Sequence, residues 1–210
     1  MMATWVYLIS TVALGLASCA IFRVRTRREH TERGRLSVAS SILELVLCLL
    51  YAAVPYIYNP PCWPWVWACT PWATEAWAAA GYVLIAVGAL IAFGSMIWLG
   101  LRRSFGQHVG ELVQSGPYRF SRNPQGVGGT LLVAGIAVLW PSWFALGWAV
   151  LWLVMFHAMV LSEEEHLRRV FGEDFLRYRR QVGRYIGRHT PRDEPRAPAP
   201  PEQNGLIRSE

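Results

Sequence analysis

Long apolar stretches constrain this chain more than any other feature. They cover about residues 3–22, 37–58, 77–100, 126–140 and 143–161. A helix needs about 20 apolar residues to cross a bilayer, and the last two stretches are short for full spans. Those two are expected to tilt, or to form one tight hairpin that does not cross fully. With 53% hydrophobic and 16% charged residues, the chain is predicted to be an all-α, integral-membrane helical bundle of about five transmembrane helices.

The distribution of arginine predicts how such a bundle is oriented. All 20 basic residues are Arg, and they fall within about 23–35, within 102–122 and after 162. The segments 59–76 and 140–143 contain none. With five spans, the basic segments lie on one side, which the positive-inside rule makes cytoplasmic. We therefore expect an integral protein of the bacterial plasma (inner) membrane, with its N-terminus outside and its C-terminus cytoplasmic.

Charge and tryptophan bear on the partners of the chain. A net charge of +6 in a soluble protein would fit nucleic acid. Here, arginines that set topology and contact anionic headgroups explain the charge better. Tryptophans crowd both arginine-free turns, as in an interfacial aromatic belt. We expect membrane lipids as partners, and no nucleic acid.

Three regions follow from composition. Residues 1–76 are predicted to form an N-terminal transmembrane hairpin, around an Arg-rich loop, and an outer loop rich in Trp, Pro and Cys. Residues 77–187 form a membrane core with a cytoplasmic amphipathic helix over 162–180. Residues 188–210 form a disordered, Pro-rich tail. In the outer loop, Cys62 and Cys69 could pair as a disulfide in an oxidising compartment or remain thiols, and no metal site is expected.

Two polar clusters carry the candidate chemistry. The first reads Leu112-Val-Gln-Ser-Gly-Pro-Tyr-Arg-Phe-Ser-Arg-Asn-Pro124. The second begins at Glu163-Glu-Glu-His-Leu167 and continues through Phe171-Gly172 to Tyr178. The apolar hairpin between the clusters returns both to the same face of a bilayer. The sequence therefore predicts one polar site at a membrane surface.

These clusters, at this spacing, resemble the isoprenylcysteine carboxyl methyltransferase and phospholipid methyltransferase superfamily over about residues 80–187. The resemblance implies a membrane enzyme that uses S-adenosylmethionine. By position, it implies that the cofactor is held by Tyr118, Asn123, Pro124, Gly128, Glu163 and Glu164, with Arg122 in the same wall. Two residues depart from the family: Asn123 replaces the commonest His, and Gly126 replaces the usual Tyr. The missing ring would widen the pocket or mark a weakened enzyme.

Elementary chemistry bears on the paired carboxylates. S-adenosylmethionine carries an ammonium and a sulfonium, so a nearby carboxylate is favourable. Adjacent residues on a helix point about 100° apart, so one of Glu163 and Glu164 is expected to bind the cofactor. The other is expected to meet an Arg or to cap the structure. His157 shares a helical face with Glu164, either within the site or as a satisfied membrane histidine. Our catalytic candidates are Arg122, Glu164 and His157.

Several functions remain open at this point. The first is methyl transfer to a lipophilic acceptor that carries an isoprenoid-like carboxyl or thiol group. The second is N-methylation of a phospholipid amine, which needs a base, with His157 and Glu44 as candidates. Glu44 lies in an apolar run and could instead bond a neighbouring helix. A binding or structural protein that has lost catalysis is the third, favoured by Gly126, and a relative of the sterol reductases is a remote fourth.

Overall fold

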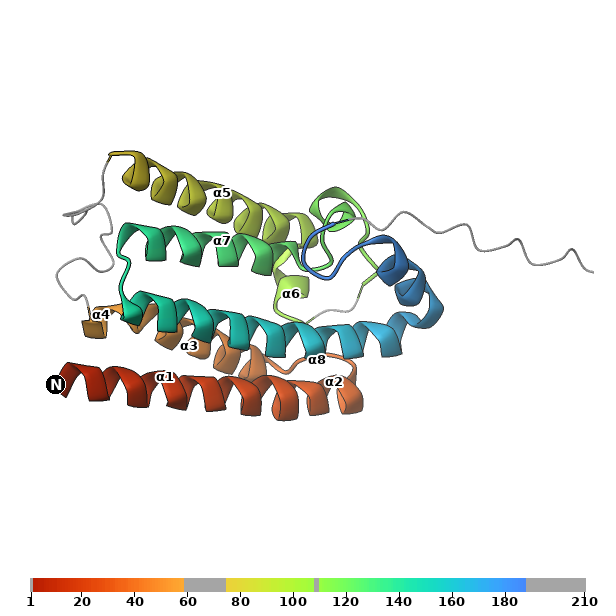
Figure 1. Cartoon of the computed structure of the whole chain (residues 1–210). Helices are drawn as coiled ribbons and strands as arrows, with labels where there is room; N and C mark the ends of the chain where they lie inside the picture. Colours follow the sequence, from red (N-terminus) through yellow and green to blue (C-terminus); the bar gives the residue numbers. More distant parts are fainter. Residues whose placement is uncertain (1, 59–74, 108–109, 188–210) are drawn as a thin grey trace, which may run out of the picture.

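The computed structural model describes residues 2–58, 75–107 and 110–187, and its regular elements there are all helical (Figure 1). Cys62, Cys69 and the Pro-rich tail lie outside these residues. The elements are α1 (Met2–Ala20), the π-helical turn η1 (Ile21–Thr26), α2 (Arg27–Arg33), α3 (Val38–Ala53), α4 (Pro55–Tyr58), α5 (Glu75–Leu99), α6 (Leu101–Ser104), the 3-10 turn η4 (Gly116–Arg119), α7 (Pro124–Leu139) and α8 (Trp143–Gln181).

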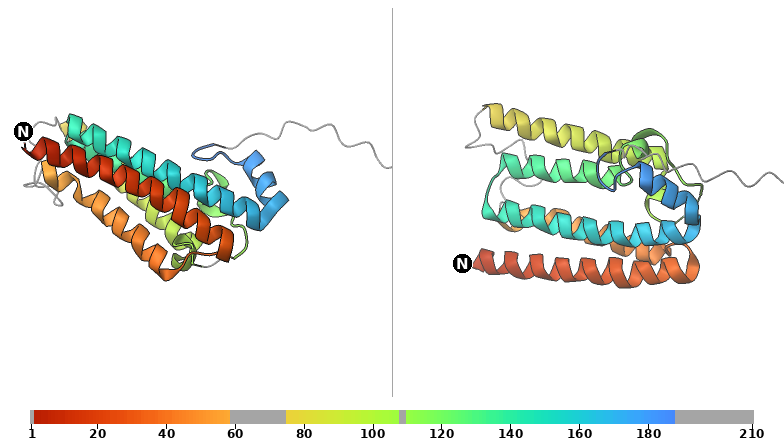
Figure 2. Two further views of the ribbon diagram at one scale, coloured as in Figure 1. Left: turned by 90° about the horizontal axis from the view of Figure 1, so that it is seen from below. Right: turned by 45° about the vertical axis from the view of Figure 1, so that its right-hand side comes forward.

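The long helices run side by side and alternate in direction (Figure 1). α7 packs between α5 and α8, and α8 also packs on α1, which contacts α3 (Figure 2). The alternation gathers α2, α6, η4 and the C-terminal part of α8 at one end of the bundle, which we call the polar end. The Arg-rich segments of the described chain therefore meet there, as predicted.

The helices confirm an all-α membrane bundle but differ in detail from the prediction. Three segments are long and apolar enough to cross a membrane: Thr4–Arg33, Ala76–Leu99 and Trp143–Gln181. α3 and α7 have 16 residues each, which cover about 24 Å of a hydrocarbon core about 30 Å thick. The expected Arg-rich loop after residue 22 is wrong, because helix continues to Arg33 and ends at Gly34, whose φ is 67°.

The apolar core joins α1, α3 and α8 through aromatic side chains. The rings of Tyr51 and Trp148 stack with centroids 4.9 Å apart. The Trp148 indole Nε1 donates to the Tyr51 carbonyl at 3.0 Å, and the Tyr7 hydroxyl donates to the Phe144 carbonyl at 2.6 Å. Polar atoms of these buried rings are thus satisfied within the protein, as an apolar solvent requires.

Glycines set the contact between α5 and α7. A Cβ on Gly128 would lie 2.4 Å from the Ala92 backbone nitrogen, and one on Gly88 would lie 2.5 Å from the Leu132 nitrogen. Such small residues let two membrane helices approach backbone to backbone. The structure thus places Gly128, which the resemblance assigned to the cofactor, in a helix–helix interface.

The amphipathic helix expected over 162–180 is not continuous. Gly172 breaks α8 with φ 49° and ψ −119°, a conformation that glycine adopts far more readily than residues with a Cβ. After this break the chain folds back toward the loop between α6 and α7 (Figure 1). There Phe175, Tyr178 and Val182 pack against Leu112 and Leu167. Residues after the break therefore pack on the body of the protein, and the expected continuity of the helix is wrong.

Candidate active site

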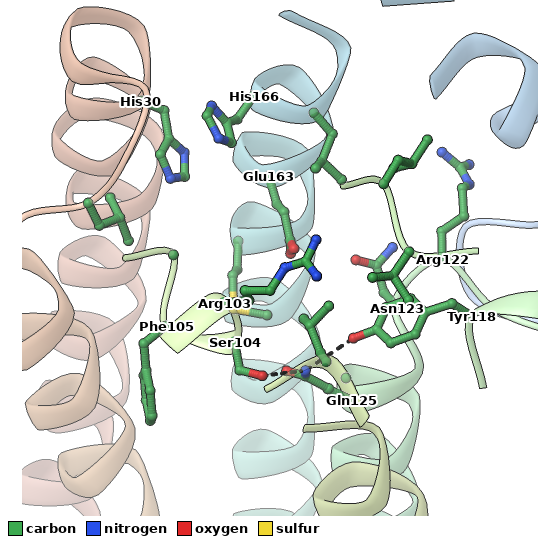
Figure 3. Close-up of a pocket in the computed structure, with 18 of the residues that line it drawn as sticks. His30, Arg103, Ser104, Phe105, Tyr118, Arg122, Asn123, Gln125, Glu163 and His166 are labelled. Atoms are coloured by element: carbon green, nitrogen blue, oxygen red, sulfur yellow. Dashed lines mark hydrogen bonds between the residues drawn. The ribbon is translucent and has the colours of Figure 1, made fainter. Parts of the chain in front are cut away.

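A cavity of about 170 Å³ opens at the polar end, between α2, α3, α6, α7 and α8 (Figure 3). Both predicted polar clusters reach it. Its lining includes four of the predicted site residues: Tyr118, Arg122, Asn123 and Glu163. Glu44 and Gly126 also line it.

Arg122, which lines the cavity, belongs to an ion-pair cluster that we call the clamp: Arg122, Glu164 and Arg184. Arg122 Nη1 lies 2.7 Å from Glu164 Oε1, and Arg184 Nη2 lies 2.9 Å from Glu164 Oε2. Burial lowers the pKa of Arg122, whereas the hydrogen bonds to Glu164 raise the pKa of Arg184. Because Glu164 is occupied by two guanidinium groups, the clamp joins α8 to the segments before α7 and after α8.

Hydrogen bonds to the backbone reinforce the clamp. Arg122 N donates to the Gly183 carbonyl at 3.1 Å. The side-chain amide of Asn123 donates to the Arg184 carbonyl at 2.9 Å, and the Tyr178 hydroxyl donates to the Tyr118 carbonyl at 2.7 Å. Asn123 therefore holds the C-terminal segment in place as well as lining the cavity.

Glu163 differs sharply from its neighbour. It lines the cavity, yet within residues 2–58, 75–107 and 110–187 it makes no hydrogen bond or ion pair. The turn of about 100° between adjacent helical residues directs Glu164 into the clamp, whereas Glu163 points into the cavity (Figure 3). The expected division between the two carboxylates is present, with Glu164 as the partner of the arginines.

A short hydrogen-bond chain positions the phenol of Tyr118. The side-chain amide of Gln125 donates to the Tyr118 hydroxyl at 3.2 Å and to Ser104 Oγ at 3.1 Å (Figure 3). Burial raises the pKa of Tyr118, so its hydroxyl stays protonated near neutrality. This chain ties η4, α6 and α7 together at the cavity.

Gly126 does not leave a hole. A Cβ at this position would lie 1.7 Å from Cε2 of the Phe156 ring, so the ring already fills the space beside the glycine. Phe156 also lines the cavity. An aromatic ring is therefore present at this place, supplied by α8 instead of α7, so the first of the two alternatives for Gly126, a wider pocket, does not hold.

Besides Glu164 of the clamp, three other predicted residues lie outside the cavity lining. Pro124 begins α7, and Gly128 contacts α5. His157 is exposed, and its Nδ1 lies 2.6 Å from the Tyr185 hydroxyl. His157 and Glu164 do share a face, since they contact the neighbouring residues Tyr185 and Arg184. The catalytic and cofactor roles assigned from the sequence stay predictions.

Sequence reasoning missed two histidines of the cavity, His30 and His166. Their rings stack with centroids 4.0 Å apart and planes inclined by 18°, and both line the cavity. His166 follows Glu163 by three residues, a spacing that places both on one helical face and could have revealed it. His30 stands in an Arg-rich segment that gave no such indication. In the described chain, no group of three or more His, Cys, Asp or Glu side chains could hold a metal ion.

Comparison with known proteins finds similarity over the part of the chain that supplies most of this site. Residues 76–174 match the family model described as phospholipid methyltransferase. The chain is 29% identical over 101 residues to a phosphatidylethanolamine N-methyltransferase of Lodderomyces elongisporus, a match that covers 48% of this chain and 11% of that protein. This chain thus spans about a tenth of the length of the curated relative it matches. No solved structure matches the chain.

The described helices form an integral-membrane bundle with a cavity at its polar end. Over residues 76–174, just under half of its length, the chain resembles the phospholipid methyltransferase family. The resemblance drawn from the two polar clusters is thereby confirmed.

Proposed function

We propose that the protein is a membrane-embedded, S-adenosylmethionine-dependent methyltransferase that acts on a lipid amine. One observation carries the proposal: the carboxyl group of Glu163 faces a cavity within the matched family region and has no partner among the described residues. A desolvated carboxylate without a cation is costly, so a cationic ligand that fills this place is stabilised.

The residues present fit the cofactor. S-adenosylmethionine supplies a methyl group on a positively charged sulfur, and it also carries an ammonium and a carboxylate. Glu163 would meet one of its positive groups. Arg103, which lines the same cavity, would meet its carboxylate. The aromatic side chains of Tyr118 and Phe156 supply apolar lining beside these charges.

Two findings favour an amine over the carboxyl or thiol acceptor that the sequence first indicated. The relative is named for N-methylation of a phospholipid amine. The cavity also contains a second carboxyl group, Glu44, which accepts a hydrogen bond from Thr26 at 2.6 Å and has no arginine partner among the described residues. Two carboxyl groups in one cavity attract an ammonium headgroup.

The protein's own task is to position the acceptor and to keep out water. Attack on the methyl carbon requires the acceptor nitrogen at about 3–3.5 Å, in line with the bond that breaks. The clamp and the Tyr118–Gln125–Ser104 chain hold the cavity walls rigid for this purpose. An ammonium must also lose a proton before its nitrogen can attack, so a base is required.

We place the polar end at the cytoplasmic face of a bacterial plasma membrane. The Arg-rich segments support this orientation through the positive-inside rule. In that orientation the cavity opens where a soluble cofactor and a lipid headgroup meet.

Calorimetric titration of the detergent-solubilised protein tests the cofactor. Wild type is expected to bind S-adenosylmethionine at one site and NADPH not at all. Glu163→Gln should weaken that binding by about 10- to 100-fold, since a hydrogen bond to a charged group contributes about 1.5–3 kcal/mol. The exposed Glu173→Gln is the matched control and should bind like wild type. Folded wild type that binds no S-adenosylmethionine would favour a binding protein without catalysis.

A further inference from the structure

The stacked histidines His30 and His166 form a second chemical group in the cavity. His30 is 8% and His166 is 7% exposed. Both ring nitrogens of His30 and Nδ1 of His166 are buried without a hydrogen-bond partner among the described residues. Buried imidazole nitrogens without partners are costly and rare. Three such atoms together at a cavity indicate a function that compensates for the cost.

The two rings together can carry one proton, bound to a nitrogen of either ring. At a centroid separation of 4.0 Å, two positive charges in a desolvated setting repel each other strongly. A single imidazolium stacked on a neutral imidazole avoids this repulsion. The pair is therefore suited to accept one proton and to release it again.

The place of the pair in the fold fits that use. His166 lies one helical turn after Glu163 and on the same face (Figure 3). A headgroup drawn into the cavity next to a cofactor held at Glu163 would thus arrive beside the rings. The pair also lies at the polar end, where α2 and α8 carry charged side chains to the surface. The charged and titratable groups around it are Glu29 on α2, Glu44 on α3, Arg103 on α6, Glu163, Glu165 and Arg169 on α8, and Arg23 and Arg27, which pair with Glu165.

We propose that the His30–His166 pair is the general base that takes the proton from the ammonium headgroup of the acceptor before methyl transfer. The N–H bond breaks, its electron pair stays on nitrogen, and the proton binds an imidazole nitrogen. The freed lone pair then forms the bond to the methyl carbon as the carbon–sulfur bond breaks and its electron pair goes to the sulfur, and the imidazolium later gives its proton to water. This inference rests on the proposed amine methylation. It also brings into the site His30, which precedes the matched region that begins at residue 76.

The test is a pH profile of kcat with phosphatidylethanolamine in mixed micelles. The double variant His30→Phe/His166→Phe keeps two stacked rings but cannot accept a proton. At pH 7 its kcat should fall by about 100-fold or more. Its rate should then rise about tenfold per pH unit toward pH 9, because an aliphatic amine with a pKa near 10 deprotonates itself. Wild type should change little over that range.

Two further readouts separate a base from a structural pair. Affinity for S-adenosylmethionine should stay within about twofold of wild type, since the cofactor carries its own charge partner in Glu163. Glu32→Gln, an exposed change on α2 beside His30, should leave the profile as in wild type. If the double variant fails to fold, His30→Phe alone should show the same rise with pH from a smaller loss.

The outcomes distinguish the inference from the proposed function. A variant rate reduced by the same factor at every pH, or not reduced at all, overturns the base while leaving the methyltransferase intact. Wild type that binds S-adenosylmethionine but methylates no amine overturns the amine acceptor, and the proton-accepting pair with it.

Discussion

The α5–α7 interface and the polar end are both buried, but different forces hold them together. Where α5 meets α7, Gly88 and Gly128 bring backbone atoms into direct contact, with no space even for a Cβ. At the polar end, long charged side chains span the distance between segments, as Arg122 and Arg184 do on either side of Glu164. The α5–α7 contact depends on the absence of side chains, whereas the contacts at the polar end depend on long charged side chains.

This difference separates stability from chemistry within one small protein. Gly88 and Gly128 have no side chain that could meet a ligand, so we expect their role to be the packing of two helices. The polar end contains one paired and one unpaired carboxyl group. Glu164 is paired with two arginines, whereas Glu163 has no partner among the described residues. Substitutions at the two places, and at the two carboxylates, should therefore fail in different ways.

The largest effect is expected from Gly128→Leu. The new side chain would collide with the backbone of α5, because even its Cβ would lie 2.4 Å from Ala92 N. A rigid backbone cannot yield as a side chain does, so the cost should exceed about 4 kcal/mol and folded protein should not accumulate. Yield of monodisperse protein in size-exclusion chromatography measures this. Gly94→Leu on α5, where nothing lies within 4 Å of the added Cβ, is the control. If Gly128→Leu folds normally but binds the cofactor more weakly, Gly128 contributes to the cofactor site and not only to helix packing.

The next effect is expected from Glu164→Gln. The change leaves two guanidinium groups beside a neutral amide, with Arg122 only 7% exposed, and breaking a buried ion pair costs about 3–5 kcal/mol. Denaturant-induced unfolding in detergent should show this loss. Glu163→Gln should instead stay near wild-type stability and lose cofactor affinity. If Glu164→Gln unfolds like wild type and binds S-adenosylmethionine poorly, the roles of the two carboxylates are reversed.

The sequence predicts most of the fold because hydropathy and arginine placement act locally. Trp143 and Pro124 begin α8 and α7 close to where the apolar stretches begin. The continuation of α1 into α2 was missed for a tertiary reason: Arg23 and Arg27 bind Glu165 on α8, so a charged segment expected as loop is stabilised as helix. The break at Gly172 was missed because glycine within a helical pattern does not reveal its own φ.

The site was predictable in part for the same reason. Residues of the two polar clusters were found because they are close in sequence and match a family pattern. His30 was not, since its contact with His166 joins residues on different helices and depends on how α2 packs on α8. The exchange between Gly126 and Phe156 is of the same kind: only the packing of α7 on α8 shows that one residue fills the space beside the other.

The smallest expected effect is the coupling between Gly126 and Phe156. Gly126→Tyr alone should destabilise the protein by about 1–3 kcal/mol, because its ring would overlap that of Phe156. Phe156→Ala alone should leave a cavity and cost about 3–5 kcal/mol. In the double variant the new tyrosine can occupy the vacated space, so the two losses should fail to add by about 0.5–3 kcal/mol. A double-mutant cycle of unfolding free energies in detergent measures that coupling, with Gly94→Tyr as the control for tyrosine on an open helix face. If the two losses simply add, the two side chains do not share one space. Gly126 would then mark the loss of the family's tyrosine ring, without Phe156 taking its place.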